Sequence, residues 1–87
     1  MPRYLAHVNV MLRPIINDPQ GLAVRDGLHS LGFEAVREVR VGKRIDVTIE
    51  AATPAEAERV ATDAAKQLLA NSVIEDFEVA VTELATA

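Results

Sequence analysis

Cysteine is absent from this chain of 87 residues, and aromatic residues make up only 3% of it. Without cysteine the chain can form no disulfide framework, no thiolate metal site and no cysteine nucleophile. With so few aromatics, its core must be built from valine, isoleucine, leucine and alanine. No signal-peptide pattern is visible, and no apolar run approaches the roughly 18 residues of a membrane span. We therefore expect a cytoplasmic protein with no membrane partner.

The overall charge is weakly acidic, at −4 at pH 7. This balance argues against nucleic acid as the main partner, because a phosphate backbone attracts basic proteins. Apolar residues are 49% of the chain, so a real core is possible. We expect one domain over residues 1–87. A domain of this size has little core, and oligomerisation would help to stabilise it.

The first part of the chain reads as a strand followed by a helix. Residues 4–12 alternate between an apolar face and a mixed face that includes His7, the pattern of a half-buried strand. The helix is predicted to begin with Asp18 as its N-cap and Pro19 at the first helical position, and to end at Gly32. Gly27 lies mid-helix, where we expect it to allow close packing against the sheet or a neighbouring chain.

The second part reads as a hairpin, a helix and a last strand. Residues 36–41 and 45–50 are predicted to be strands joined by a turn at Gly42-Lys43. Thr53-Pro54-Ala55-Glu56 is a capping box that opens the second helix. The buried stripe of that helix is expected to be Ala57, Val60, Ala61, Ala64 and Leu68. Residues 77–82 alternate as the last strand, and 85–87 are expected to be a frayed tail.

This order of elements predicts an α+β fold, the ferredoxin-like βαββαβ sandwich. Its sheet would have four strands, antiparallel or mixed, with the first and third in the middle and both helices on one face. The other face would be open and would carry both His7 and Asp46, which could then face each other. Such a mixed surface suits a contact with a second copy, because isologous dimers are the commonest oligomers.

A search for chemistry finds little. His7 beside Asp46 could orient an imidazole for base work, but an interface histidine is the competing interpretation. With two histidines and no cysteine, no metal-ligand spacing exists. Gly42-Lys43 lacks the upstream glycine and the following helix of a phosphate-binding loop. We therefore expect no catalytic residue, no cofactor and no metal in this chain.

Two short polar motifs remain, and both contain glycine and lie at junctions between elements. They are Asp18-Pro19-Gln20-Gly21 and Val39-Arg40-Val41-Gly42-Lys43. Basic side chains at the tip of the predicted hairpin would tune the encounter with a partner. The alternative interpretation is that Gly42 is only a turn glycine, that Asp18-Pro19 only starts a helix and that the basic side chains are only solvated. Our hypothesis is that the following residues face partner subunits: Asp18, Pro19, Gln20, Gly21, Arg40, Gly42 and Lys43.

Together with Val10-Met11-Leu12 and the run Leu28-His29-Ser30-Leu31-Gly32-Phe33, these motifs resemble the PurS family. Members are the small subunit of bacterial and archaeal phosphoribosylformylglycinamidine (FGAM) synthase, and the likeness covers nearly the whole chain. The resemblance implies a non-catalytic accessory and assembly subunit. Its complex makes FGAM from formylglycinamide ribonucleotide, glutamine and ATP in de novo purine synthesis.

The resemblance also implies the partners. A PurQ-like glutaminase subunit releases ammonia, and a PurL-like synthetase subunit binds ATP with Mg²⁺ and the ribonucleotide. The small subunit would bridge the two, support ammonia transfer and form a homodimer or homotetramer. Two other hypotheses stay open at this point. One is a stand-alone ligand-sensing dimer of ferredoxin-like topology, and the other is a small enzyme that uses His7.

Overall fold

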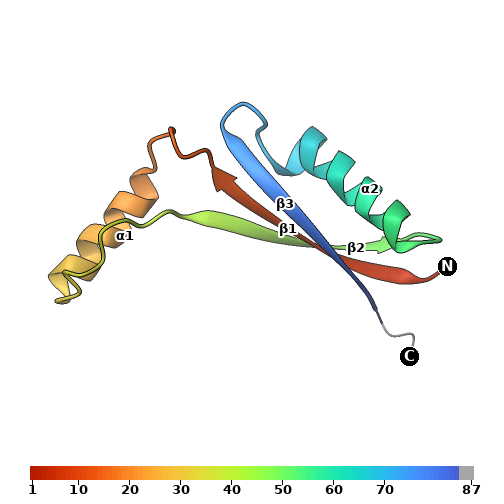
Figure 1. The fold of residues 1–87 in the computed structure, drawn as a ribbon, viewed down its shortest axis with the longest axis horizontal. Coiled ribbons are helices and arrows are strands. Elements are labelled where there is room, and N and C mark those ends of the chain that lie inside the picture. Colours follow the sequence, from red (N-terminus) through yellow and green to blue (C-terminus); the bar gives the residue numbers. More distant parts are fainter. Residues whose placement is uncertain (85–87) are drawn as a thin grey trace.

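The computed structural model describes residues 1–84. The sheet has three antiparallel strands in the order β2-β1-β3, so β1 is central and the other two are its edges. Figure 1 shows α2 alongside the crossing strands, while α1 lies beyond one end of the sheet. The elements are β1 (Arg3–Leu12), α1 (Pro19–Ser30), β2 (Gly42–Glu50), α2 (Pro54–Ala64), the π-helical turn η1 (Ala65–Leu69) and β3 (Glu75–Glu83).

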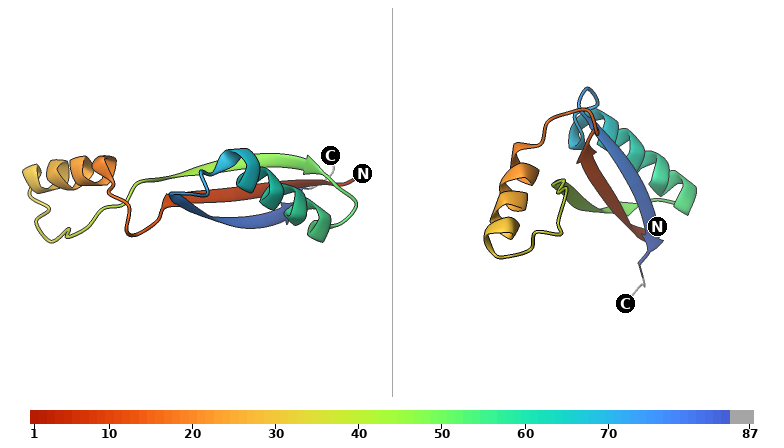
Figure 2. Two further views of the ribbon diagram at one scale, coloured as in Figure 1. Left: turned by 90° about the horizontal axis from the view of Figure 1, so that it is seen from above. Right: turned by 60° about the vertical axis from the view of Figure 1, so that its left-hand side comes forward.

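The core lies between the sheet and α2. The apolar face of β1 is at most 2% exposed at Tyr4, Ala6, Val8 and Val10, as its alternation predicts. The face of α2 and η1 that covers it is made of alanines, which let the helix approach the sheet closely. Ala57, Ala61 and Ala65 are all 0% exposed. No helix of residues 1–84 lies over the opposite face of the sheet (Figure 2), as predicted.

The start of α2 is confirmed, but its buried stripe is confirmed only in part. Thr53 Oγ1 accepts a hydrogen bond from the Glu56 backbone N–H at 3.1 Å, and Pro54 is the first helical residue. Leu68 is 84% exposed, so its predicted place in the core is wrong. The cause is η1. A π-helical turn contains more residues than an α-helical turn, so the residues that follow it no longer continue the buried face of α2. Leu69 packs against the core instead.

The predicted strand 36–41 and its hairpin are wrong for the single chain. Residues 36–41 belong to no strand, and Gly42 already lies in β2, paired with Met11 of β1. A tight hairpin turn at this point would favour a glycine with positive φ. Among residues 1–84 the one residue with positive φ is Gly32, at 96°, just beyond α1. The chain therefore runs straight through Gly42 into β2, and the α+β sheet has three strands instead of four.

The first helix stands apart from the sheet, so the prediction of two helices on one face is also wrong. Figures 1 and 2 show α1 projecting from one end of the molecule, with the segment after it returning towards β2. We call residues 13–41 the arm. A Cβ added at Gly27 would meet nothing within 4 Å, so this glycine does not pack on the sheet. The molecule is correspondingly long and flat, 51 × 32 × 15 Å.

No helix within residues 1–84 combines the length and the hydropathy that crossing a bilayer requires. The expected frayed tail, residues 85–87, lies outside the described residues.

Candidate functional site

The two motifs singled out in the sequence meet in space, at the point where the arm joins the sheet. Asp18 is the residue that connects them, and it is only 4% exposed. Its Oδ1 accepts a hydrogen bond from the Gly21 backbone N–H at 2.9 Å, which confirms the predicted N-cap. Its Oδ2 accepts one from the Val41 backbone N–H at 2.7 Å. One carboxylate therefore both caps α1 and fixes the chain that enters β2.

Arg40 reinforces the same connection from the other side. Its Nη2 donates hydrogen bonds to the backbone oxygens of Arg13 and Ile16, each at 3.0 Å. These two oxygens belong to the loop that leads from β1 into α1. The hypothesis of a basic hairpin tip is therefore wrong for Arg40, because there is no hairpin and its guanidinium is bound within the chain. We call Asp18, Gly21, Arg40 and Val41 the arm junction.

Both motif glycines permit close approach and neither makes a turn. A Cβ added at Gly21 would lie 2.2 Å from the backbone oxygen of Val39 and 2.8 Å from Asp18 Oδ2. A Cβ added at Gly42 would lie 2.0 Å from Met11 Sδ and 2.5 Å from the backbone oxygen of Val10. Any side chain at either position would therefore push backbone apart. Glycine at these two places keeps the arm seated against the entry to β2.

The electrostatics of the junction favour an ionised carboxylate. The hydrogen bond from Val41 N–H, and next the one from Gly21 N–H, lower the pKa of Asp18, while burial opposes them. The positive charge of Arg40 adds to the lowering. The cavity beside Asp18 and Arg40 measures about 70 Å³, well below the roughly 300 Å³ of a small-molecule site. The junction thus holds backbone in place, and this small cavity has no room for a substrate. A wider, open hollow of about 490 Å³ lies on the other side of Arg40 and is lined also by Met11, Leu12, Pro14, Glu38 and Asp76.

The remaining motif residues lie around the junction but point to solvent. Pro19 and Gln20 are exposed in the first turn of α1, and Lys43 is exposed at the start of β2. Asp18 and Val41 are 23 residues apart in the sequence, and the hydrogen bond between them brings the two motifs together. The sequence contained the signal for Asp18 as a cap. It contained none for its second bond, because an N-cap pattern describes only local contacts.

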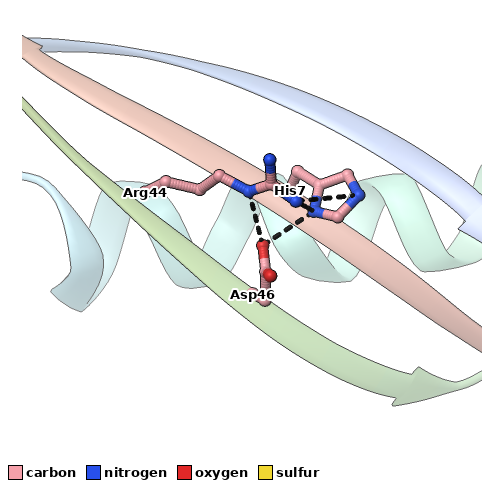
Figure 3. Close-up of polar contacts among 3 residues, drawn as sticks. All are labelled: His7, Arg44 and Asp46. Carbon is pink, nitrogen blue, oxygen red and sulfur yellow. Dashed lines mark hydrogen bonds and ion pairs between the residues drawn. The ribbon is translucent and has the colours of Figure 1, made fainter.

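The second candidate lies on the open face of the sheet, where His7, Arg44 and Asp46 form a cluster (Figure 3). His7 and Asp46 face each other across β1 and β2, as predicted, and His7 Nδ1 lies 2.7 Å from Asp46 Oδ1. Arg44 Nε donates to the same oxygen at 2.9 Å, and Arg44 Nη2 lies 2.6 Å from His7 Nδ1. One ring nitrogen cannot donate to Asp46 and accept from Arg44 at once, so the tautomer decides which bond forms.

This open-face cluster is poorly suited to catalysis. The hydrogen bond from Arg44, and next that from His7, lower the pKa of Asp46. A carboxylate already paired with an arginine is a weak base, and among the described residues no serine or threonine hydroxyl forms a hydrogen bond with His7. Within residues 1–84 no group of three histidine, aspartate or glutamate side chains is placed to hold a metal ion. The cluster resembles surface pairing more than an active site.

Comparison with known proteins gives a consistent result. The model of one family, "PurS: Phosphoribosylformylglycinamidine (FGAM) synthase", matches residues 5–83. A PurS subunit of FGAM synthase from Synechocystis is 43% identical over 81 residues, which are 93% of this chain and 81% of that relative. The structure of PurS from Thermus thermophilus superposes with a TM-score of 0.85 at 44% identity, covering 97% of this chain and 100% of that one. A chain in the structure of PurLQS from Thermotoga maritima superposes with a TM-score of 0.84 at 31% identity, covering 97% and 100%.

Proposed function

Because the chain belongs to the PurS family and is a subunit of FGAM synthase, we propose that it is the non-catalytic assembly subunit of that enzyme. It would bridge a PurL-like synthetase subunit and a PurQ-like glutaminase subunit and support the transfer of ammonia between them. The reaction, FGAM formation from formylglycinamide ribonucleotide, glutamine and ATP, would take place in those partners, in the cytoplasm.

The observation that carries this proposal is the likeness to a chain of PurLQS over 97% of the sequence. PurLQS from Thermotoga maritima is a complex in which PurS associates with other subunits of the enzyme. The side-chain chemistry is compatible with the role. Within residues 1–84 the one histidine–carboxylate pair has its carboxylate bonded to Arg44.

The cofactors of the reaction belong, on this proposal, to the partners. ATP with Mg²⁺ would be held by the synthetase subunit, and this chain would supply no ligand to either. What it offers instead is a shaped surface. The arm junction fixes Pro19, Gln20 and Lys43 as exposed neighbours of a rigid centre, and these are the residues that we propose to touch partner subunits. Gly21, Asp18, Arg40 and Gly42 would act indirectly, by holding that surface in shape.

Self-association is the second part of the proposal. Large apolar side chains on the arm are exposed, among them Ile15 at 91%, Leu31 at 75% and Phe33 at 56%. Exposed apolar area of this kind marks interaction surfaces. We propose a homodimer, or a homotetramer built from it, as the form that enters the complex.

The test is assembly in solution. The purified chain is mixed with its cognate synthetase and glutaminase, and the masses of the species are measured by size-exclusion chromatography with light scattering. A ternary species that contains all the chains is expected, and Lys43→Glu should weaken it. Lys66→Glu is the matched control, because Lys66 is an exposed lysine in η1 that belongs to neither of the two motifs. Failure of the unaltered chain to associate would contradict the proposal.

A further inference from the structure

The wider hollow beside Arg40 lies where three separate parts of the chain meet, and we call it the arm hollow. Its volume of about 490 Å³ lies within the range of roughly 300–1,000 Å³ that small-molecule sites occupy. The end of β1, the start of β3 and the arm each supply part of its wall: Met11, Leu12, Pro14, Glu38, Arg40 and Asp76. A ligand held there would therefore touch the arm and the sheet at the same time.

The apolar part of this wall is built around Met11. Met11 is 41% exposed and lies in a row across the sheet, paired with Gly42 of β2 and with Asp76 of β3. A Cβ added at Gly42 would lie 2.0 Å from Met11 Sδ, so the thioether occupies the space that a side chain at position 42 would need. Leu12 and Pro14 add further apolar surface. Methionine adapts its shape to what it contacts, and so provides a surface that suits an aliphatic ligand.

The polar part of the wall begins with Arg40, whose guanidinium is fixed in place. Arg40 is half-buried, and its Nη2 donates to the backbone oxygens of Arg13 and Ile16. Among the described residues, no hydrogen bond engages its Nε or its Nη1. A guanidinium that is already positioned and still has donors to offer is well suited to bind a carboxylate.

Two carboxylates complete the polar part, one on each side of Met11. Glu38 is exposed on the arm, and within residues 1–84 it forms no salt bridge. Asp76 is exposed on β3, and its partner is Arg13, whose Nε lies 3.5 Å from Asp76 Oδ1. Both side chains therefore keep acceptors that are free for a ligand. An ammonium group, which has three donors and no acceptor, matches such a pair.

We propose that the arm hollow binds a free α-amino acid with an aliphatic side chain. Its ammonium group would lie between Glu38 and Asp76, and its carboxylate would accept hydrogen bonds from Arg40. Its side chain would lie on the apolar wall around Met11. This binding site is a property of the chain alone, and its evidence is independent of any role in the synthase.

Other classes of ligand fit the arm hollow less well. A phosphate or a nucleotide would bring several negative charges to a wall that holds two carboxylates and one arginine. A metal ion would lack ligands, because within residues 1–84 no group of three histidine, aspartate or glutamate side chains is placed to hold one. A wholly apolar compound would cover the two carboxylates without giving them a hydrogen-bond donor.

A second open hollow, of about 560 Å³, adjoins Arg13 and also carries both signs of charge. Its arginine is already engaged, because Arg13 Nη2 donates to the Ser72 backbone oxygen at 2.6 Å and Arg13 Nε pairs with Asp76. Glu75 is engaged as well, since its Oε1 accepts a hydrogen bond from the Asn71 backbone N–H at 2.7 Å. This second hollow therefore offers a carboxylate ligand less than the arm hollow does.

The open shape of the arm hollow sets the expected affinity. A small ligand that is only partly buried binds weakly, and we expect a dissociation constant of about 0.1–10 mM. The bound amino acid would connect Glu38 and Arg40 of the arm with Asp76 of β3. It should therefore hold the arm against the sheet and slow the proteolysis of the arm.

Three probes with the same aliphatic body test the two charged groups separately. L-leucine carries both groups, isopentylamine carries only the ammonium group, and isocaproate carries only the carboxylate. Each probe is titrated at neutral pH into the isotope-labelled full-length chain, and the backbone amides are followed by nuclear magnetic resonance. Leucine should shift the amides of Met11, Glu38 and Asp76 with one dissociation constant. It should bind about threefold or more tighter than isopentylamine and about tenfold or more tighter than isocaproate.

Charge-neutral variants test the contribution of each carboxylate. Glu38→Gln and Asp76→Asn keep the shape of the side chain and remove its charge, so each should weaken leucine binding about three- to tenfold. The matched control is Glu78→Gln. Glu78 is an exposed carboxylate two positions along β3 on the same face as Asp76, and it does not line the arm hollow. Its replacement should leave the affinity for leucine unchanged.

Several results would overturn the proposal. The absence of a saturable shift with leucine, or equal binding of leucine and isocaproate, would show that the hollow does not recognise an ammonium group. Equal binding of leucine and isopentylamine would show that Arg40 does not receive the carboxylate. Equal effects of Glu38→Gln and Glu78→Gln would show that binding depends only on the general surface charge. All of these measurements use the chain by itself, so they stay decisive whether or not the chain assembles the synthase.

Discussion

Alanine in place of Gly21 and of Gly27 should have opposite effects on the stability of the arm, although both glycines lie in α1. At Gly27 the added Cβ meets nothing within 4 Å. Alanine there should stabilise the helix by about 0.8–1 kcal/mol, the difference in helix propensity. At Gly21 the added Cβ would lie 2.2 Å from the Val39 backbone oxygen. Backbone must move to relieve that overlap, at a cost of about 1–3 kcal/mol.

The comparison isolates the overlap, because the gain in helix propensity is shared by both variants. The free energy of unfolding of Gly21→Ala should therefore be lower than that of Gly27→Ala by about 1–3 kcal/mol. The difference is measured by urea unfolding at matched protein concentration, monitored by circular dichroism. The rate of proteolytic cleavage within α1 reports on the stability of the arm alone. Equal stability of the two variants would refute the close seating of α1 on Val39. Destabilisation by Gly27→Ala that grows on dilution would place Gly27 in a contact between copies, as its sequence position suggested.

Further predictions concern the charged groups. Asp18→Asn should raise the hydrogen-exchange rate of the Val41 amide by about tenfold or more, because that amide loses a charged acceptor. Folding lowers the pKa of Asp18. The stability that the Asp18 carboxylate adds is therefore complete above its ordinary pKa and is lost as pH falls through the lowered pKa. Acid should open the arm, and amides of the arm that stay protected from hydrogen exchange at low pH would contradict this. The pKa of Asp46 is lowered too, and its nuclear magnetic resonance titration should show a midpoint below that of an exposed aspartate. His7→Ala should leave glutamine-dependent turnover of the complex within about twofold, whereas a loss of turnover would support an enzyme based on His7. Arg40→Ala should increase proteolysis within the arm, and Lys43→Glu should change only association with partners and its salt dependence.

Much of the fold could be predicted because local rules determine it. The alternation of β1 correctly identified its buried face, from Tyr4 to Val10. The two helix starts followed from Asp18-Pro19 and from Thr53-Pro54, since an N-cap and a proline at the first position act over one turn. Strand parity placed His7 and Asp46 on the same face of the sheet, and the register of β1 and β2 sets them opposite each other. These features need only contacts between residues that are neighbours along an element or across one pair of strands.

The errors in the sheet and in the placement of α1 have one physical origin, which is the choice between a closed and an open hairpin at Gly42. Sequence alone shows two strand-like segments around a glycine, and a turn is the usual result. Here the second bond of Asp18, to Val41 N–H, and the bonds of Arg40 hold the chain straight. The misplaced Leu68 has a separate cause, the π-helical turn at Ala65–Leu69, which shifts the buried face by one residue and has no recognisable signal in sequence.

The motifs led to the candidate site, but its contacts within the chain could not be predicted from them. Asp18, Gly21, Arg40 and Gly42 were expected to touch partners, and the structure uses each of them within the chain. A polar residue beside a glycine is compatible with both roles in a single sequence. Only the geometry distinguishes them, through the buried carboxylate and the absence of room for a Cβ. The exposed residues Pro19, Gln20 and Lys43 keep their prediction as partner contacts.

The most direct test of the assembly role is the synthase activity of purified cognate synthetase and glutaminase, measured with and without this chain. Glutamine and ammonia should be compared as nitrogen donors. The account predicts that glutamine-dependent activity requires the chain, whereas ammonia-dependent activity of the synthetase does not, because the chain contributes assembly and no catalytic group. Glutamine-dependent activity that is the same without the chain would contradict the account.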